Sequence, residues 1–394
     1  MVVGGRGECE QADAHAGHAA RGERPGPPDR AMIRYTIADI ADIQAIRNRL
    51  AQHSRGIDRA DAGLLADCYH ADGTVDYGFF EGPADRFAAI LAAAQLGQPV
   101  TLHRTCQMWV RLAGDEAVSE SYVIAYAQSP EADGSARQRL ICGRYLDRHA
   151  RRGGVWRMLH RRYVLDTNLN WPGSQAIAPL APLAAHLPAG GQGAADPGLA
   201  LLAQAHASNV RLSRGESGMA DNPPDPAAVE AVLAKQQIAD LTLAYCRGID
   251  RADEALLKAI FHEDSTVVSG AFNGSGQMFA TEICRIVRAV FDQTFHSIAN
   301  QWIELRGDGA VGESYVIAVA TMTDEDGSKA EMLTGGRYID RYTRLGGTWR
   351  IAERTFVIDW SIKQPSTRMT GEGMYAPLPQ GCFGPDDPVY RLWN

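Results

Sequence analysis

The sequence predicts two tandem domains of the α+β class, each with helices packed on a curved antiparallel sheet. The first observation is a repeat: Arg-Gly-Ile-Asp-Arg-Ala-Asp occurs at 55–61 and again at 247–253. The second is that further matching blocks follow both copies in the same order. The third is a change of period within each half, from helical spacing to runs of Val, Ile, Tyr and Trp. A repeat this long indicates complete domains, because solenoid repeats span only ~20–50 residues.

The composition excludes several classes of protein. The chain has 394 residues, of which 45% are apolar, and a net charge of -8. The mild negative charge and the lack of a basic run argue against nucleic-acid binding. No apolar run approaches the ~18 residues of a membrane span, and the first residues lack the apolar core of a secretory signal. Seven cysteines without a Cys-x-x-Cys pair indicate reduced thiols and a cytoplasmic location.

Changes in composition divide the chain into five segments. We expect a disordered tail at 1–31, where Gly, Ala, Arg, Glu and Pro dominate without periodicity. The first domain is predicted at 32–171 and the second at 229–362. Between them, 172–228 has the Pro-, Ala- and Gly-rich composition of a linker. We expect the extension at 363–394 to wrap a surface or to lie in a subunit contact.

The first copy alternates between helical and strand patterns. Ile40, Ile43, Ile46 and Leu50 recur at helical spacing and indicate a helix over 36–54. The other elements predicted here are a short helix after Asp61, a turn at 69–73, a strand at 74–81, a helix at 84–96 and strands at 100–112, 116–128, 138–149 and 154–165. Gly and Asp separate the last four strands, which indicates hairpins.

The second copy repeats this order. Ile238, Leu241 and Tyr245 share one face of a predicted helix. The later elements are a short helix after Asp253, a helix at 277–291 and strands at 294–306, 310–323, 330–342 and 347–359. Three blocks keep the register between the copies: 120–125 with 313–318, 143–148 with 336–341 and 153–157 with 346–350.

Asp58 and Asp250 are the first candidate functional residues. Each follows a helix, whose carbonyl end disfavours a negative charge, so each carboxylate needs a partner. A structural role, as a salt bridge to a nearby Arg or a cap of the turn, is the alternative. Asp61 and Asp253 have the position of N-caps before the next short helix.

His103 and His296 occupy the same place in the repeat, near the start of matching strands. A histidine in a strand is commonly a packed core residue. A His hydrogen-bonded to a buried carboxylate is instead a general base, because the carboxylate sets the tautomer and stabilises the imidazolium. Both copies hold the Asp and the His, which raises this interpretation for the pair without proving it.

Three further positions could contribute to a site: Tyr245, which is His53 in the first copy; Asn300, which is Gln107; and Arg354, which is Arg161. The Tyr could donate a hydrogen bond to the substrate or simply pack with a wet hydroxyl. An Arg that points inward needs an anionic or polar partner, because a bare buried charge is costly.

The sequence lacks the motifs of metal, phosphate-binding and serine-nucleophile sites. His70 and His262 follow the short helices and are expected to be exposed. The sequence has no His/Cys or carboxylate cluster for a metal and no phosphate-binding Gly loop or G-x-S-x-G. We therefore predict a site without a metal or cofactor.

The order Tyr-x4-Asp, His-x3-Asn, Gly-Arg-Tyr and Gly-x-Trp-Arg-x3-Arg in the second copy resembles the SnoaL-like branch of the NTF2-like superfamily. The resemblance covers about 36–170 and 229–362. Scytalone dehydratase, hexachlorocyclohexane dehydrochlorinase and bile-acid 7α-dehydratase look most similar. The family implies a cone-shaped α+β barrel around a largely apolar pocket, and a lyase with a His–Asp dyad that needs no cofactor.

Carried onto the second copy, the resemblance assigns proton abstraction to His296 and its orientation to Asp250. Tyr245 and Arg354 would assist the leaving group or a developing anion, and Asn300 matches an Asn of the family. This resemblance predicts a complete site in the second copy.

The first copy keeps Asp58, His103 and Arg161 but departs from the pattern at His53 and Gln107. Its acid and polar-orienting groups therefore differ from those of the second copy. It could act on another substrate or serve as a structural partner.

The leading hypothesis is a cofactor-independent lyase for a hydrophobic cyclic or aromatic small molecule, with a dehydratase-type elimination or a related C–C cleavage. One alternative is an isomerase or cyclase of a polyketide or steroid-like substrate, and another is a non-catalytic binding or assembly protein. Partners other than the small molecule are not expected to include nucleic acid or membrane. The two copies are expected to form an intramolecular pseudo-dimer, and a homo-oligomer is a further possibility.

Overall fold

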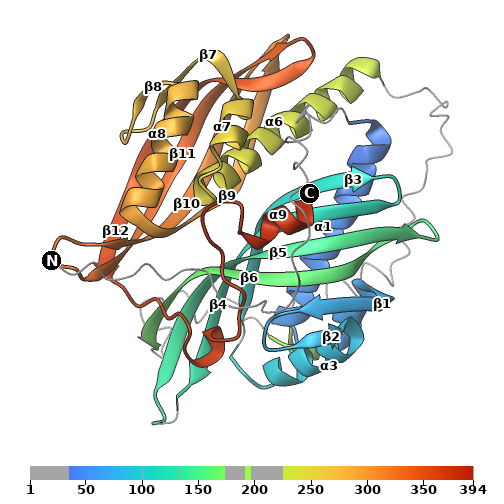
Figure 1. The fold of residues 1–394 in the computed structure, drawn as a ribbon. Helices are drawn as coiled ribbons and strands as arrows, with labels where there is room; N and C mark the ends of the chain where they lie inside the picture. The colour runs from blue at the N-terminus through green and yellow to red at the C-terminus, as the bar shows by residue number, and fades with distance from the viewer. Residues whose placement is uncertain (1–34, 100, 132, 174–190, 197–224, 394) are drawn as a thin grey trace, which may run out of the picture.

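The computed structural model describes residues 35–99, 101–131, 133–173, 191–196 and 225–393. The predicted tail at 1–31 and most of the predicted linker at 172–228 lie outside these residues. Two α+β domains follow one another along the chain, which confirms the fold class (Figure 1). In the described ranges, no helix is long and apolar enough to cross a membrane.

The first domain contains three helices and six strands in its described residues. They are α1 (Ile37–Asp58), α2 (Ala62–Asp67), β1 (Tyr69–Asp76), β2 (Glu81–Pro83), α3 (Ala84–Gln95), β3 (Leu102–Ala113), β4 (Glu116–Pro130), β5 (Ala136–Arg152) and β6 (Val155–Gly173). A short 3-10 turn, η2 (Gly193–Ala195), follows it.

The second domain repeats the first. Its elements are α6 (Pro226–Asp250), α7 (Glu254–Ile260), β7 (Phe261–Val268), β8 (Asn273–Ser275), α8 (Gly276–Val290), β9 (Phe291–Arg306), β10 (Gly309–Thr323), β11 (Lys329–Leu345) and β12 (Thr348–Pro365). The C-terminal segment adds η3 (Gly373–Tyr375) and α9 (Pro388–Trp393).

Both sheets have the same topology. The strand order is β2-β1-β6-β5-β4-β3 in one and β8-β7-β12-β11-β10-β9 in the other. The four long strands pair antiparallel, as the hairpin signals predicted, while β1 and β7 pair parallel with β6 and β12. The residues predicted as a turn at 69–73 belong to β1, so that prediction was wrong.

Local sequence explains where the helices begin. The Thr36 hydroxyl accepts from the Asp39 amide at 3.2 Å, and the Asp39 carboxylate accepts from the Thr36 amide at 2.6 Å, which forms a capping box for α1. Asp61 and Asp253 accept from the amides of Leu64 and Leu256, each at 2.9 Å, which confirms them as N-caps.

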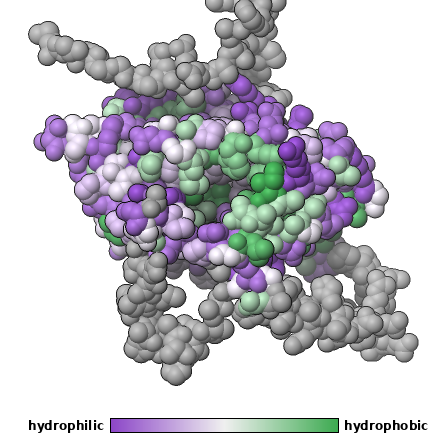
Figure 2. Space-filling view, turned by 90° about the horizontal axis from the view of Figure 1, so that it is seen from below, coloured by the Kyte–Doolittle hydropathy of each residue, from purple (hydrophilic) through white to green (hydrophobic). Residues whose placement is uncertain are grey.

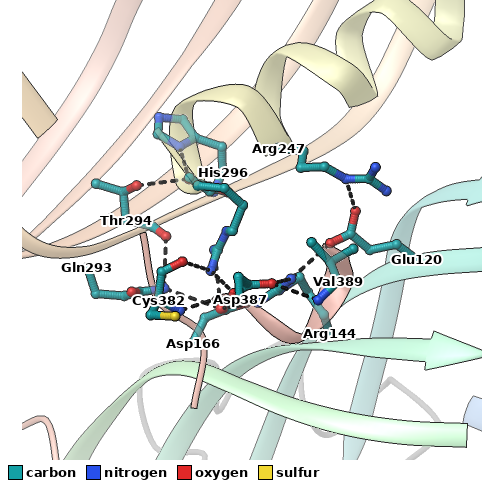
Figure 3. A network of polar contacts seen from close by, with 12 residues as sticks. Glu120, Arg144, Asp166, Arg247, Gln293, Thr294, His296, Cys382, Asp387 and Val389 are labelled. Atoms are coloured by element: carbon teal, nitrogen blue, oxygen red, sulfur yellow. Dashed lines mark hydrogen bonds and ion pairs between the residues drawn. The ribbon is translucent and has the colours of Figure 1, made fainter. Parts of the chain in front are cut away.

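Buried ion pairs join the two domains (Figure 3). Arg144 on β5 donates to Glu120 at 3.0 Å and to Asp166 at 2.9 and 3.0 Å. It also donates to Asp387 of the C-terminal segment at 2.7 and 2.9 Å. Arg251, after α6, donates to the same Asp387 at 2.8 Å. Both guanidinium groups are fully buried, and buried charges are tolerated only when paired, so these parts must assemble together.

The C-terminal segment lies along the first domain and returns to the domain boundary (Figure 1). Leu165 of β6 donates its amide to Pro379 at 2.7 Å and accepts from Gly381 at 2.8 Å. Further on, the Trp393 ring lies 5.0 Å from the Trp109 ring of β3. Residues from the end of the chain therefore complete the surface of the first domain.

Substitution Asp387→Asn is expected to lower the free energy of unfolding by about 3–5 kcal/mol, because it removes one of the carboxylates that balance the buried Arg144 and Arg251 and so leaves an excess positive charge in the interior. Burial acts to raise the pKa of Asp387, but Arg144 and Arg251 outweigh it and hold the pKa below its ordinary value. Urea denaturation at pH 7 measures the change. Asp72→Asn, which breaks an exposed pair with Arg152, is the control and should have little effect. An unchanged midpoint for Asp387→Asn would show that the cluster does not support the fold.

A second prediction concerns the dependence of stability on pH. His149 on β5 is 1% exposed, and its Nε2 bonds to the Ser119 hydroxyl at 2.8 Å. Burial lowers the pKa of His149 from 6.5 to about 4. The unfolded chain takes up this proton at higher pH than the folded chain, so stability falls by about 3 kcal/mol between pH 6.5 and 4.

The variant His149→Gln keeps a group that can bond to Ser119 but cannot titrate. Its free energy of unfolding should lose this component of the acid dependence. Urea titrations of both proteins at a series of pH values test the expectation, which fails if the difference between them is the same at pH 7 and pH 4.

Candidate active site

Asp250 and His296 meet where α6 ends beside β9. After Asp250 the chain turns through Ala252, whose φ of 48° is rare for a residue with a side chain. His296 donates its backbone amide to Asp250 Oδ2 at 2.9 Å, and its Nδ1 lies 2.6 Å from Oδ1. The Thr294 hydroxyl donates to the same Oδ1 at 3.0 Å. The carboxylate therefore accepts from three groups of one strand, which sets the orientation of the imidazole.

The charge of Asp250 is stabilised although the residue is fully buried. Burial acts to raise the pKa of Asp250. The attraction and hydrogen bond of His296, with Arg251 nearby, outweigh burial and hold the pKa below its ordinary value. An ionised carboxylate on Nδ1 favours the tautomer with a proton at that atom, which leaves the Nε2 lone pair available.

The first domain reproduces this arrangement. His103 donates its amide to Asp58 at 2.9 Å, its Nδ1 lies 2.6 Å from the carboxylate, and the Thr101 hydroxyl donates at 2.7 Å. Ala60 also has a positive φ, 53°. The structure thus brings together both predicted Asp and His pairs, and the side chains of His103 and His296 are 15% and 18% exposed.

Arg354 and Tyr245 lie inside the second barrel. Arg354 donates to Asp340 at 2.8 and 2.7 Å, and its guanidinium carbon is 4.0 Å from the centre of the Tyr245 ring. The Tyr245 ring stacks 6.1 Å from Phe279 and lies 5.2 Å from Tyr338. Burial raises the pKa of Tyr245 above its ordinary value, so the phenol stays protonated and can donate a hydrogen bond.

His53 takes a different role in the first barrel. Arg161 pairs with Asp147 at 2.7 and 2.8 Å, and its Nη1 lies 2.8 Å from His53 Nδ1. The other ring nitrogen lies 3.0 Å from the Tyr69 hydroxyl. Burial, then repulsion from Arg161 and His103, lowers the pKa of His53 well below its ordinary value. His53 is therefore neutral with both nitrogens engaged, and it cannot act as the acid of a site.

The two barrels also differ at the strand beside their interior. In the first, Leu165 is fully buried, and Tyr375 and Leu378 of the C-terminal segment join the same apolar core. In the second, the matching residue Ile358 is 58% exposed. Hydrophobic side chains also gather around a hollow on the face seen from below in Figure 1 (Figure 2). The end of the chain thus closes the first barrel, while the corresponding side of the second is open.

Asn300 and Gln107 do not join the His–Asp pairs. The register of β9 and β3 shifts at these residues, and both line a groove of about 580 Å³ between the domains. Asn300 is exposed, and Gln107 accepts from the Ile298 amide at 2.5 Å. The strand irregularity directs them out of the barrel, which strand periodicity alone does not predict.

His70 and His262 are buried, so the prediction that they are exposed was wrong. They belong to β1 and β7, and their Nε2 atoms lie 2.9 Å from the Ala150 carbonyl and 3.2 Å from the Thr343 carbonyl. Both residues are buried because β1 and β7 pair in parallel with β6 and β12.

Sequence reasoning missed two pairs of supporting residues. Thr101 and Thr294 each stand two positions before the His and donate to the Asp. Asp147 and Asp340 each neutralise the buried Arg. A signal was present, because all four are identical between the copies, and the Asp closes the repeated Gly-Arg-Tyr block.

Comparison with known proteins places these features in a family. A family model described as SnoaL-like domain matches residues 38–162 and 230–355. No curated protein sequence matches the chain. Similar solved structures include a hexachlorocyclohexane dehydrochlorinase (LinA) type 2, with 18% identity, coverage of 37% of this chain and 99% of that chain, and a TM-score of 0.35. For LinA type 3 from Novosphingobium barchaimii LL02 these values are 17%, 36%, 98% and 0.34.

A candidate scytalone dehydratase from Novosphingobium aromaticivorans DSM 12444 gives 20% identity, coverage of 36% of this chain and 97% of that chain, and a TM-score of 0.31. At such identities and TM-scores, these neighbours carry no argument about function. The two matches to the family model together cover more than half of the chain. The chain therefore belongs to the SnoaL-like domain family and contains that domain twice.

Proposed function

We propose that the second domain is a lyase in which His296, oriented by Asp250, removes a proton from a hydrophobic cyclic or aromatic small molecule. The observation that carries this proposal is the 2.6 Å contact between His296 Nδ1 and the buried carboxylate. Family membership supports it, because SnoaL-like proteins include lyases, dehydratases and isomerases.

The proposed reaction is a base-initiated elimination. The substrate C–H bond breaks, its proton moves to His296 Nε2, and its electron pair forms the new double bond. The leaving group departs with its own bonding pair, and the Asp250 carboxylate stabilises the imidazolium that forms. A protonated Tyr245 would donate a hydrogen bond to the departing group.

Arg354 supports the same step electrostatically. Its Nη1 has no hydrogen-bond partner among the described residues, whereas the matching atom of Arg161 is bonded to His53. A guanidinium in a buried, low-dielectric site stabilises an anion that develops as the proton leaves. In the second barrel, Arg354 therefore keeps an N–H group that can bond to a substrate. In the first barrel, the matching N–H group of Arg161 is already bonded to His53.

Aromatic side chains in the second domain support the proposed substrate class. Phe261 and Phe279 have ring centres 5.9 Å apart, and Tyr338 and Phe356 have centres 5.6 Å apart. Such side chains favour a flat apolar skeleton, with polar recognition confined to the His, Tyr and Arg. A C–C cleavage that begins with the same proton transfer falls within this proposal.

An isomerase is the second candidate, because His296 holds the proton at Nε2 and can return it to another carbon of the same substrate. The two reactions differ in product: an elimination releases a leaving group, while an isomerisation conserves the substrate formula. For the first domain we propose a structural role, since His53 is locked and the C-terminal segment closes the barrel.

The test compares His296→Gln with the matched variant His103→Gln. Cyclic alcohols and halides with an acidic C–H next to the leaving-group carbon are screened by mass spectrometry. His296→Gln should lose about 10²–10⁴-fold in rate, which is the usual contribution of a general base, while His103→Gln should retain the wild-type rate. Asp250→Asn should fall with His296→Gln.

Two results would count against the proposal. One is equal loss in the two His variants, which would assign the reaction to neither barrel alone. The other is ligand binding, seen as a thermal shift, without any turnover in the wild type, which would favour a binding protein.

A further inference from the structure

The outer face of the first sheet is covered within the chain. Its residues Glu120, Tyr122, Arg144, Leu146 and Asp166 are all at most 2% exposed. A surface of the second domain and the C-terminal segment covers them. We call it the turn–loop surface, and it consists of Arg247, Arg251, Phe295 and Asp387. For example, Arg247 donates to Glu120 at 2.5 Å, and the Phe295 ring lies 5.1 Å from Tyr122.

The second sheet carries the same outer face at the same register. Its matching residues are Glu313, Tyr315, Arg337, Ile339 and Asp359. Tyr315 pairs with Arg337 as Tyr122 pairs with Arg144. Arg337 donates to Asp359 at 3.0 Å through the two atoms that Arg144 uses toward Asp166. Here, however, Tyr315 is 44% and Ile339 43% exposed.

The tryptophans beside these faces show the same contrast. Trp109 on β3 has the Arg247 guanidinium 4.0 Å above its ring and Trp393 against it. Trp302, at the same position of β9, is 69% exposed. An exposed indole beside an apolar and charged face is typical of a protein contact.

The first domain has its own turn–loop surface, formed by Arg55, Arg59, Leu102 and Asp196. The side chains of Arg55 and Arg59 are 30% and 22% exposed, whereas those of Arg247 and Arg251 are 3% and 0% exposed. Leu102 is 59% exposed, whereas the matching Phe295 is fully buried.

The loops of the two turn–loop surfaces are built alike. Gly-x-x-Asp-Pro occurs at 193–197 and at 384–388, after the first and the second domain. The Gly193 amide donates to the Arg59 carbonyl at 3.1 Å, and the Gly384 amide donates to the Arg251 carbonyl at 2.7 Å. Each Asp then pairs with the Arg of its turn. The repeat therefore extends beyond the domains to the contact surface itself.

We propose that a second copy of this chain places its first-domain turn–loop surface on the outer face of the second domain. The contact between chains then repeats the one that joins the domains within a chain. Arg55 and Arg59 of one copy face Glu313 and Asp359 of the other. Leu102 packs on Tyr315 as Phe295 packs on Tyr122 within one chain.

The contact is heterologous, since each copy offers one surface and receives the other. It also reaches a dyad, because Arg59 directly follows Asp58 as Arg251 follows Asp250. Association would therefore fix Arg59 beside the first dyad. Within one chain, the first domain already fixes Arg251 beside the second dyad in this way.

Two exposed positions allow a test without disturbing the fold. Trp302→Glu disables the outer face, and Leu102→Glu disables the turn–loop surface. Sedimentation velocity over a concentration series should show association of the wild-type chain and about 30-fold or more weakening in either variant, as for residues central to an interface. Arg152→Glu, an exposed substitution outside both surfaces, should associate like the wild type.

A mixture of the two variants distinguishes this contact from a symmetric one. Each variant alone lacks one surface on every copy, but the mixture retains one intact pair and should form a one-to-one complex. A wild type that stays monomeric overturns the proposal. So does a Leu102→Glu variant that still associates fully, since the contact would then join two outer faces.

Discussion

Two buried guanidinium groups that share two carboxylates, Asp166 and Asp387, hold the two domains together. Arg144 belongs to the first sheet, Arg251 to the turn after α6, and Asp387 to the last residues of the chain. Both guanidinium groups also pair with Asp166, and loss of any one member leaves the buried charges unbalanced, which is strongly destabilising. Since Arg251 directly follows Asp250, the same cluster positions the carboxylate of the second His–Asp pair. Domain packing and the geometry of the candidate site are thus parts of one assembly.

Duplication placed identical residues in different surroundings. The Arg and Asp of the outer face are fully buried in the first domain and partly exposed in the second. Leu165 lies under the C-terminal segment, whereas Ile358 lies in the open. His53 occupies the position of Tyr245 and is engaged on both ring nitrogens. The two domains therefore keep one fold and one dyad but differ in access and in the groups available to a substrate.

The sequence allowed the His–Asp pairs of the candidate site to be predicted because the repeat contains them twice. Asp and His recur at the same spacing in both copies, and the structure brings each pair to 2.6 Å. Spacing could not reveal the direction of Asn300, since a shift of strand register turns it toward the domain boundary. Nor could it reveal the burial of His70, which depends on parallel pairing with a strand distant in sequence. Such contacts arise from long-range pairing, which local patterns do not encode.

By itself, the sequence determined two α+β domains and the paired Asp and His positions. These follow from periodicity, turn residues and self-similarity, all of which are local or repeated signals. Only the tertiary structure decided which barrel is closed, which outer face is covered and which Arg keeps an unpaired donor. Those outcomes depend on where the C-terminal segment and the α6–α7 turn pack. The C-terminal segment and the α6–α7 turn both pack against the first domain. Local sequence patterns, which are nearly the same in the two copies, do not specify which domain they cover.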